Sequence, residues 1–447
     1  MNKLPVILLL FLVMPIVAGS ALAKEAAPGV TPMTGVPPAI DSQVTMKNYR
    51  DFPMNRWSFR NAGAPLNVVM IPRQGDIRVL PGPLRPEIGQ VQYTDLHGRQ
   101  LGFDALFEAN FADGLVVVQG EELLHERYFH GFNAHAQHIW FSMTKSLAST
   151  AFGLLVEQGL VDLEASPAKY IPELENGGFA RVSIQQVLDH ATAIDFKENY
   201  TDPASDFLRF YAPALNMAWL PGAADVQPGE TDIYGAHDFL ARFVKPDTNL
   251  KPGTAFDYNS ANADLLGWLI SRISGEPFQD FIQRTIWARL GAEHDAFVAV
   301  DRAYMPVVTG GMNSTLRDAA RFGMMIRDRG VFGGEQLIPA SWVDATLDID
   351  DRLRGMMAAN PTYGDDPWIA YHHMWWVLDE EAGEYCAVGV HGQVIYINRG
   401  ADTVIAWFSS QPGASAAGNP DFHSKLAAAR ALASTLDSKN PLASSKR

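Results

Sequence analysis

The sequence predicts an α+β fold: an antiparallel sheet, built from both ends of the chain and flanked by helices, with an inserted, mainly helical domain. Three observations predict it. Strand patterns occur before residue 130 and return after residue 374, and the region between them has helical periodicity. The late strand patterns are separated by short turns, which join antiparallel strands only. With 447 residues, of which 47% are hydrophobic, the chain can build such a two-part core.

A β-hairpin is the first predicted element. Residues 115–119 read as the apolar strand Leu-Val-Val-Val-Gln, Gly120 and Glu121 supply the turn, and residues 123–128 return. A helix is predicted next, because apolar residues recur at helical spacing until Gly159, the expected C-cap. A buried helix therefore begins soon after the first part of the sheet.

The middle of the chain predicts helices joined by Pro- and Gly-rich connections, and its end predicts a sheet. Helical patterns cover residues 184–190, 236–244, 262–273 and 316–328. Short runs rich in aromatic and β-branched residues cover 375–378, 385–390, 394–397 and 403–409, and an amphipathic helix over 425–436 follows. The single cysteine, Cys386, lies in a late strand. It is expected in the core and cannot form an intrachain disulfide.

Residues 1–23 have the pattern of a secretory signal peptide. Lys3 precedes an apolar run that ends at the small-residue cleavage site Ala21-Leu22-Ala23. A retained membrane anchor is the alternative, but the run is short for a membrane span. We therefore expect cleavage after Ala23, a periplasmic or secreted protein, and no stable membrane association afterwards.

The domain organisation follows from these patterns. Residues 24–50 are rich in Pro, Gly, Ala and Thr, which predicts a flexible leader, and residues 57–86 are expected to wrap the surface. One folded unit is expected over 51–436. Its expected parts are a sheet subdomain over 51–150 plus 346–436 and a helical subdomain over 151–345, before a polar tail over 437–447.

Charge and histidine spacing exclude several classes of function. The net charge of −15 argues against nucleic acids and anionic membranes as partners. The chain has no glycine-rich phosphate loop and no G-x-S-x-G elbow. His130, His135 and His138 lack a clear carboxylate partner, and His372 and His373 would point to opposite faces of a strand. No metal site is predicted, and the sequence indicates no oligomeric state.

The most informative segment is Ser142-Met143-Thr144-Lys145, at the start of the first helix. Residues three apart lie on one helical face, so the Ser142 hydroxyl and the Lys145 amine can share a hydrogen bond. A serine hydroxyl becomes a nucleophile when a neighbouring base takes its proton, and a lysine kept neutral by burial can be that base. A helix cap with a solvated lysine is the alternative for this segment taken alone.

Two later segments supply further candidates. Tyr258 lies just before a predicted helix, where the helix dipole and Lys145 would favour phenolate character and a role as proton carrier. A packed core tyrosine is the alternative. The second segment is His391-Gly392-Gln393, at the edge of a late strand. Its backbone N–H groups could point into a cleft, and Gly392 permits close approach.

In this order, the three segments resemble the motifs of the serine β-lactamase and penicillin-binding protein superfamily. The superfamily carries S-x-x-K, then Y-x-N, then a K-T-G-like or H-x-G-like strand segment. Here they read Ser142-x-x-Lys145, Tyr258-Asn259-Ser260 and His391-Gly392-Gln393, and the resemblance spans roughly residues 100–436. It implies the β-lactamase/transpeptidase-like fold.

Departures from the motifs point to the class C-like esterases and the 6-aminohexanoate-dimer hydrolases. Ser260 replaces the Asn of Y-x-N, and His391 replaces the Lys of K-T-G. Residues 199–203 are similar to the loop that carries a substrate-contacting tyrosine in the amide hydrolases, which would be Tyr200 here. His423 falls where those enzymes have a histidine near the cleft. The missing Asn and Lys, which help to hold a β-lactam, weaken β-lactamase activity in particular.

The resemblance implies a serine hydrolase that cleaves a small-molecule ester or linear amide through an acyl-enzyme. Ser142 would be the nucleophile, Lys145 the base and Tyr258 the proton relay. The N–H groups of Ser142 and Gln393 would bind the oxyanion, and no cofactor would be needed. Two alternatives stay open: a penicillin-recognising peptidase or β-lactamase, and a sensor that is acylated without turnover.

Overall fold

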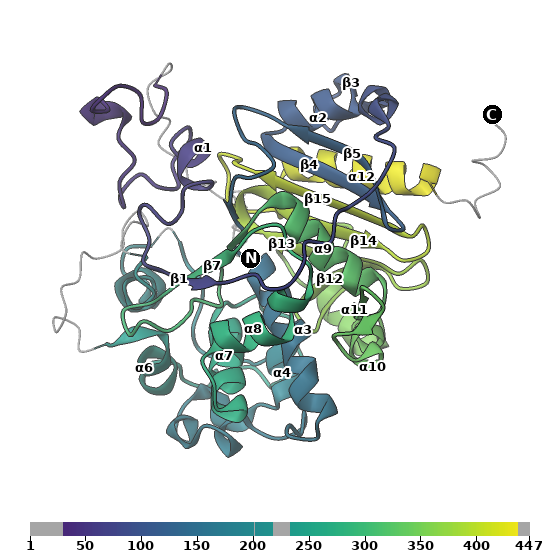
Figure 1. Cartoon of the computed structure of the whole chain (residues 1–447). Coiled ribbons are helices and arrows are strands. Elements are labelled where there is room, and N and C mark those ends of the chain that lie inside the picture. The colour runs from purple at the N-terminus through teal and green to yellow at the C-terminus, as the bar shows by residue number, and fades with distance from the viewer. Residues whose placement is uncertain (1–29, 201, 218–232, 437–447) are drawn as a thin grey trace, which may run out of the picture.

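A computed structural model describes residues 30–200, 202–217 and 233–436. The predicted signal peptide (1–23) and polar tail (437–447) lie outside the described residues. Figure 1 shows a sheet with helices on both faces and, below it, a mainly helical part. The fold as a whole is a mixture of helices and antiparallel sheet, as the sequence predicts. None of the described helices is long and apolar enough to span a bilayer.

The main sheet is antiparallel and joins the two ends of the chain. Its order is β11 (Ala370–His372), β12 (Trp375–Asp379), β13 (Glu384–Gly389), β14 (Gln393–Asn398), β15 (Thr403–Ser409), β4 (Ala112–Gln119) and β5 (Glu122–Tyr128). The join is the pairing of β15 with β4, in which Ile405 faces Val117. The predicted hairpin and four late strands are confirmed, and β11 is an additional strand. Cys386 is buried in β13, as expected.

Helices cover both faces of the main sheet, as the two opposite views show. On one face α9 (Leu316–Arg327) packs on β14 and β15, and on the other α2 (Phe103–Ala109) and α12 (Pro420–Leu436) pack on β4 and β15. A Cβ at Gly323 of α9 would lie 2.7 Å from Ile395 and 2.8 Å from Val404, so the close approach of helix and sheet requires glycine. Although it falls within residues 151–345, α9 belongs by packing to the sheet.

The remaining helices are mostly short. They are α1 (Asn55–Ser58), α3 (Met143–Glu157), α4 (Ile184–Leu188), α5 (Ala212–Ala214), α6 (Gly235–Arg242), α7 (Ala261–Ser274), α8 (Phe278–Thr285), α10 (Ala340–Ala345) and α11 (Asp351–Ala358). The longest of them, α3, contacts β13 and β14 on one side and α7 on the other. Its first turn therefore lies where the sheet meets the helical part.

A second sheet, which the sequence did not predict, lies beside the start of α3. Its order is β1 (Val68–Ile71), β7 (Ala296–Ala299), β8 (Met312–Ser314) and β6 (His138–Ile139). The described residues also form two small two-stranded sheets. One pairs β2 (Gln92–Thr94) with β3 (Gln100–Gly102), and the other pairs β9 (Val331–Phe332) with β10 (Glu335–Gln336). These strands have two to four residues, too few for a period-two pattern to stand out.

The segment before residue 60 differs from the flexible leader expected over 24–50. Tyr49 is fully buried and packs with Phe59 at a ring-centroid distance of 5.8 Å. Both belong to a small apolar cluster with Leu66, Ile139 and Phe141. The N-terminal segment is therefore tied to the residues that lead into α3.

Candidate active site

Ser142 lies at the junction between the second sheet and α3. The preceding Trp140 is anchored twice: its backbone N–H donates to the Met312 carbonyl and its indole N–H donates to Ser314 Oγ, both at 2.8 Å. Phe141 then has φ 47°, a left-handed conformation that few residues other than glycine adopt. Ser142 is the N-cap residue of α3, yet its side chain caps no backbone N–H. Its hydroxyl is thus available for other partners.

The predicted Ser142–Lys145 pair is present. Lys145 Nζ lies 2.9 Å from Ser142 Oγ and donates to the Thr309 carbonyl at 2.6 Å. The lysine is fully buried, and burial lowers its pKa to about 8, although the carboxylates of Glu198 and Asp264 act in the opposite direction. Near neutral pH a useful fraction of Lys145 is therefore an uncharged amine that can accept the Ser142 proton.

Asp264, on α7, helps to position Lys145 indirectly, through Thr309. Its carboxylate accepts hydrogen bonds from the Thr309 N–H (2.9 Å), the Thr309 hydroxyl (2.8 Å) and the Tyr211 hydroxyl (2.6 Å). These contacts hold the Thr309 carbonyl toward Lys145 Nζ. The arrangement positions the amine and leaves its lone pair for Ser142.

Tyr258 reaches Ser142, but its protonation differs from the expectation. Its hydroxyl lies close enough to the Ser142 side chain for that side chain to lower the pKa of Tyr258, and Lys145 Nζ lies 5.3 Å from the centre of its ring. The ring packs against His190 and stacks on Trp376, with centroid distances of 5.0 and 5.5 Å. Burial raises the pKa of Tyr258 well above its usual value of 10, although Ser142 acts in the opposite direction. The predicted phenolate is therefore wrong: Tyr258 is a neutral phenol, which can donate a proton.

Glu198 is a member of the site that the sequence reading missed. One carboxylate oxygen accepts the Ser260 backbone N–H, and the other accepts the Tyr200 hydroxyl at 2.7 Å. Glu198 thus ties the loop that carries Tyr200 to the Tyr258-Asn259-Ser260 motif. Tyr200 and Ser260 both line the pocket in front of Ser142, so the expected position of Tyr200 at the cleft agrees with the structure.

The segment His391-Gly392-Gln393 contributes differently from the expectation. The His391 ring is buried; its Nδ1–H donates to the Gln411 carbonyl at 2.7 Å, and its Nε2 accepts from Arg50 Nε at 3.2 Å. The Gln393 side chain is turned into the sheet, where Nε2 donates to the Ser409 carbonyl at 2.6 Å. Gly392 has φ 91° and is packed against Gln411. Only the backbone of this segment is left for an oxyanion.

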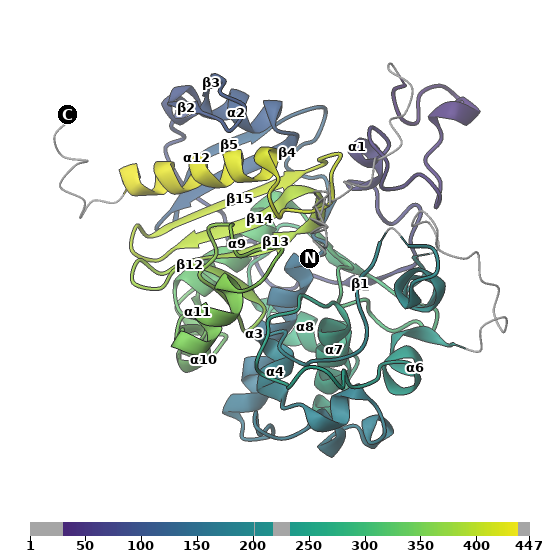
Figure 2. The same cartoon turned by 180° about the vertical axis from the view of Figure 1, so that it is seen from behind.

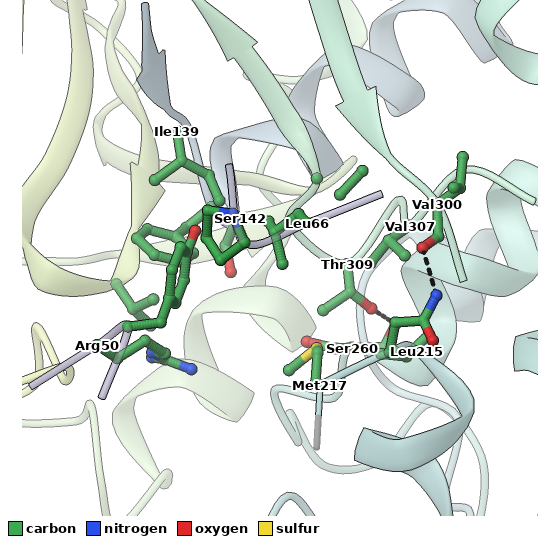
Figure 3. A pocket seen from close by; sticks show the side chains of 18 of the residues that line it. Arg50, Leu66, Ile139, Ser142, Leu215, Met217, Ser260, Val300, Val307 and Thr309 are labelled. Carbon is green, nitrogen blue, oxygen red and sulfur yellow. Dashed lines mark hydrogen bonds between the residues drawn. The ribbon is translucent and has the colours of Figure 1, made fainter. Parts of the chain in front are cut away.

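The pocket in front of Ser142 has a volume of about 300 Å³ and is mainly apolar. Arg50, Tyr200, Ser260 and Thr309 are among its polar lining residues. Its apolar lining includes Leu66, Ile139, Phe141, Leu215, Met217, Val300, Val307 and Val390. Figure 3 shows Arg50 on one side of Ser142 and Leu215, Val300 and Val307 on the other. An apolar pocket with a few convergent polar groups is typical of a small-molecule site.

The other predicted histidine, His423, is not among the residues that line this pocket. It lies in the first turn of α12, with Nε2 3.0 Å from Asp366 Oδ1. His372 and His373 also differ from the expectation. A left-handed φ of 48° at His373 stacks their rings at 4.1 Å, on one side rather than on opposite faces. Across the described ranges, no three His, Cys, Asp or Glu side chains are grouped as metal ligands.

Arg50, Glu198 and Asp264 could not be assigned to the site from sequence. Arg50 lies in a segment that the sequence predicts to be flexible, and Glu198 and Asp264 lie outside the three sequence motifs. A weak signal existed for two of them: Glu198 lies just before Tyr200, and Asp264 is an acidic residue between the apolar residues Ala263 and Leu265.

Comparison with known proteins agrees with this geometry. A family described as Beta-lactamase matches residues 103–430. A 6-aminohexanoate-dimer hydrolase of Paenarthrobacter ureafaciens is 31% identical over 377 residues, which are 84% of this chain and 90% of that protein. A Bacillus anthracis structure provisionally named as a 6-aminohexanoate-dimer hydrolase is 27% identical with a TM-score of 0.76, over 88% of this chain and 97% of that one.

A family VIII carboxylesterase structure shares the fold at 16% identity, with a TM-score of 0.53, over 78% of this chain and 98% of that one. The extent of the family match and the identity to the curated relative together show the relationship. The chain therefore belongs to the beta-lactamase family and is a hydrolase with that fold.

Proposed function

We propose that this protein is a serine hydrolase that cleaves a linear amide or an ester through an acyl-enzyme on Ser142. The observation that carries the proposal is the 2.9 Å contact between Ser142 Oγ and Lys145 Nζ, because the lysine is buried and its pKa is about 8. Similarity to the 6-aminohexanoate-dimer hydrolases favours linear amides, and the esterase fold neighbour leaves esters open.

The mechanism follows from the placement of these groups. As Ser142 Oγ bonds to the carbonyl carbon, Lys145 takes the hydroxyl proton. The backbone N–H groups of Ser142 and Gln393 are the proposed donors to the oxyanion. Tyr258 then donates its proton to the leaving nitrogen or oxygen as the bond to carbon breaks, and it recovers a proton from Lys145. Water attacks the acyl ester in the same way and restores Ser142.

A substrate panel with wild type and Ser142→Ala tests this function. The panel comprises p-nitrophenyl esters, linear amide oligomers and nitrocefin, and continued turnover of an ester or amide that depends on Ser142 is expected. A single burst of one equivalent of leaving group, followed by no release, would instead identify an acylated sensor.

A periplasmic or secreted location is part of the proposal, and fractionation of cells that express the full chain tests it.

The acid limb of the pH profile should report Lys145. Below a pH of about 8 the amine is increasingly protonated and cannot accept the Ser142 proton, so kcat/KM should fall about tenfold per pH unit. Nearby histidines cannot produce this limb, because burial holds the pKa of His190 well below its usual range and that of His391 at about 3. The measurement is kcat/KM for p-nitrophenyl butyrate from pH 5.5 to 9.5, corrected for spontaneous hydrolysis. A flat profile would remove Lys145 as the base.

Short-chain esters should be cleaved faster than β-lactams, by at least about tenfold in kcat/KM. Ser260 and His391 replace the groups that the superfamily uses to hold the antibiotic, and His391 is not among the residues that line the pocket. The measurement is the kcat/KM ratio of p-nitrophenyl butyrate to nitrocefin. A ratio below one would place the chain with the β-lactamases in function.

A further inference from the structure

His190, which follows α4, contacts three consecutive residues around Tyr258. Its backbone carbonyl accepts the Asp257 N–H at 2.9 Å, and its ring nitrogen Nδ1 accepts the Asn259 N–H at 3.0 Å. Between these two bonds, the His190 ring packs against the Tyr258 ring at a centroid distance of 5.0 Å. One residue therefore holds the backbone on both sides of the proposed proton donor.

The position of His190 is itself fixed by strand β11. The His190 ring is fully buried, and the Tyr371 ring packs edge-on against it at a centroid distance of 4.9 Å. The next residue of β11, His372, lies with Nδ1 2.6 Å from Oδ1 of Asp189, the residue before His190. Because two adjacent residues of each segment are paired in this way, the His190 ring cannot shift away from Tyr258 without breaking the second pair.

The protonation state of His190 follows from its contacts. Because Nδ1 accepts the Asn259 N–H, the hydrogen of the neutral ring is on Nε2. Burial, together with the charge of Lys145, lowers the pKa of His190 well below its usual range, so the ring stays neutral near pH 7. A protonated ring would carry a hydrogen on Nδ1 and would lose the bond to Asn259.

The other ring nitrogen shows that packing alone does not explain a histidine at this position. Among the described residues, Nε2 of His190 has no hydrogen-bond partner. An unpaired donor in the interior costs about 1–3 kcal/mol, and an apolar side chain would avoid that cost. What an apolar side chain cannot supply is the Nδ1 lone pair that accepts the Asn259 N–H.

We propose that His190 is a positioning residue for proton transfer by Tyr258: its Nδ1 lone pair holds the Asn259 backbone and so fixes where the Tyr258 hydroxyl lies. His190 is not among the residues that line the pocket, so it acts through Tyr258 and not on the substrate. A displacement of about 1 Å in a catalytic group can cost about 100-fold in rate. The inference rests on the proposed serine-hydrolase function and on Tyr258 as its acid.

Two variants of the same side-chain shape test the Nδ1 contact. His190→Leu removes the acceptor, so kcat for a linear amide should fall by about 10- to 100-fold. KM should stay near the wild-type value, and p-nitrophenyl butyrate should lose much less, because p-nitrophenolate leaves without a proton. His190→Asn places an oxygen near the Nδ1 position and tolerates the left-handed φ of 51°, so it should restore most of the amide kcat.

His373→Leu is the matched control. His373 is also buried, has a left-handed φ of 48°, and stacks on Trp342 at a centroid distance of 4.3 Å. This variant should lower Tm as His190→Leu does and leave the ratio of amide to ester kcat at the wild-type value. Circular dichroism shows whether each variant is folded.

A double-mutant cycle with Tyr258→Phe separates positioning from a general structural effect. If His190 acts through the Tyr258 hydroxyl, adding His190→Leu to Tyr258→Phe should lower the amide kcat little further, whereas the losses in Tm should add. A further 10- to 100-fold loss in the double variant would overturn the proposal. Equal losses on amide and ester in His190→Leu, or no recovery in folded His190→Asn, would also overturn it.

A measurement on the unmodified protein keeps the test independent of variant folding. Histidine-selective ¹⁵N NMR should show the His190 ring as a neutral tautomer with hydrogen on Nε2 near pH 7, and a cation or an Nδ1–H tautomer would overturn the proposal. All of these outcomes leave Ser142-dependent turnover in the wild type. Absence of that turnover for every substrate would instead overturn the proposed function itself.

Discussion

Ser142→Ala should abolish measurable turnover of every substrate and leave the fold intact. The Ser142 hydroxyl is the nucleophile that contacts Lys145 Nζ, and loss of such a nucleophile in serine hydrolases reduces kcat by about 10⁶-fold. The hydroxyl caps no backbone N–H of α3, so the variant should lose at most about 2 kcal/mol of unfolding free energy. The measurements are kcat for an ester and an amide, and chemical unfolding followed by circular dichroism.

Ser146→Ala is the matched control on the same helix. Its hydroxyl donates to the Met374 carbonyl at 2.7 Å in the interior, so this variant should lose about 1 kcal/mol of stability and keep its activity. The two variants are therefore expected to differ: Ser142→Ala loses activity, whereas Ser146→Ala loses stability and keeps its activity. Near-wild-type esterase activity in a folded Ser142→Ala protein would refute the mechanism.

Tyr258→Phe should harm amide hydrolysis more than hydrolysis of an activated ester. An amine must be protonated as it leaves, and the neutral Tyr258 phenol is the donor placed next to Ser142. The kcat for a linear amide should therefore fall by about 10²–10⁴-fold, the range of general acid catalysis. p-Nitrophenolate leaves without a proton, so the ester should lose only the contribution of Tyr258 to activating Ser142.

Tyr371→Phe provides the comparison for this prediction. Tyr371 packs edge-on against Tyr258 at a centroid distance of 5.6 Å, and its other ring contacts are with His190, Phe256 and Trp376. Removal of its hydroxyl should affect both substrates slightly and equally. If Tyr258→Phe lowers both rates by the same factor, Tyr258 acts in nucleophile activation only; no loss at all would make it a packing residue.

Most of the main sheet could be predicted because its elements are long enough to show a local pattern. The hairpin of β4 and β5 and the late strands β12 to β15 have distinct runs of apolar and β-branched residues between turns. The second sheet could not be predicted, because β6 has two residues and β8 has three. Such strands form through tertiary pairing, and their own side chains show no period.

The spacing within the first motif was sufficient to predict the central pair of the site. Ser142 and Lys145 are three residues apart on one helix, so local geometry alone brings their side chains together. The protonation of Tyr258 did not follow from its position before a helix, because the aromatic side chains packed around it come from distant segments. Desolvation by burial raises the pKa of Tyr258 and outweighs the opposing influence of Ser142.

The sequence by itself determined the nucleophile, its base, the family resemblance and the antiparallel sheet, since each depends on spacing along one element or on motif order. The tertiary structure decided the charges that surround the nucleophile. Arg50 lies in a segment that resembled a flexible leader. Glu198 lies in a loop, and Asp264 lies on α7. Each of these residues contacts residues far away in the sequence. A local sequence pattern cannot predict which distant side chains will come into contact.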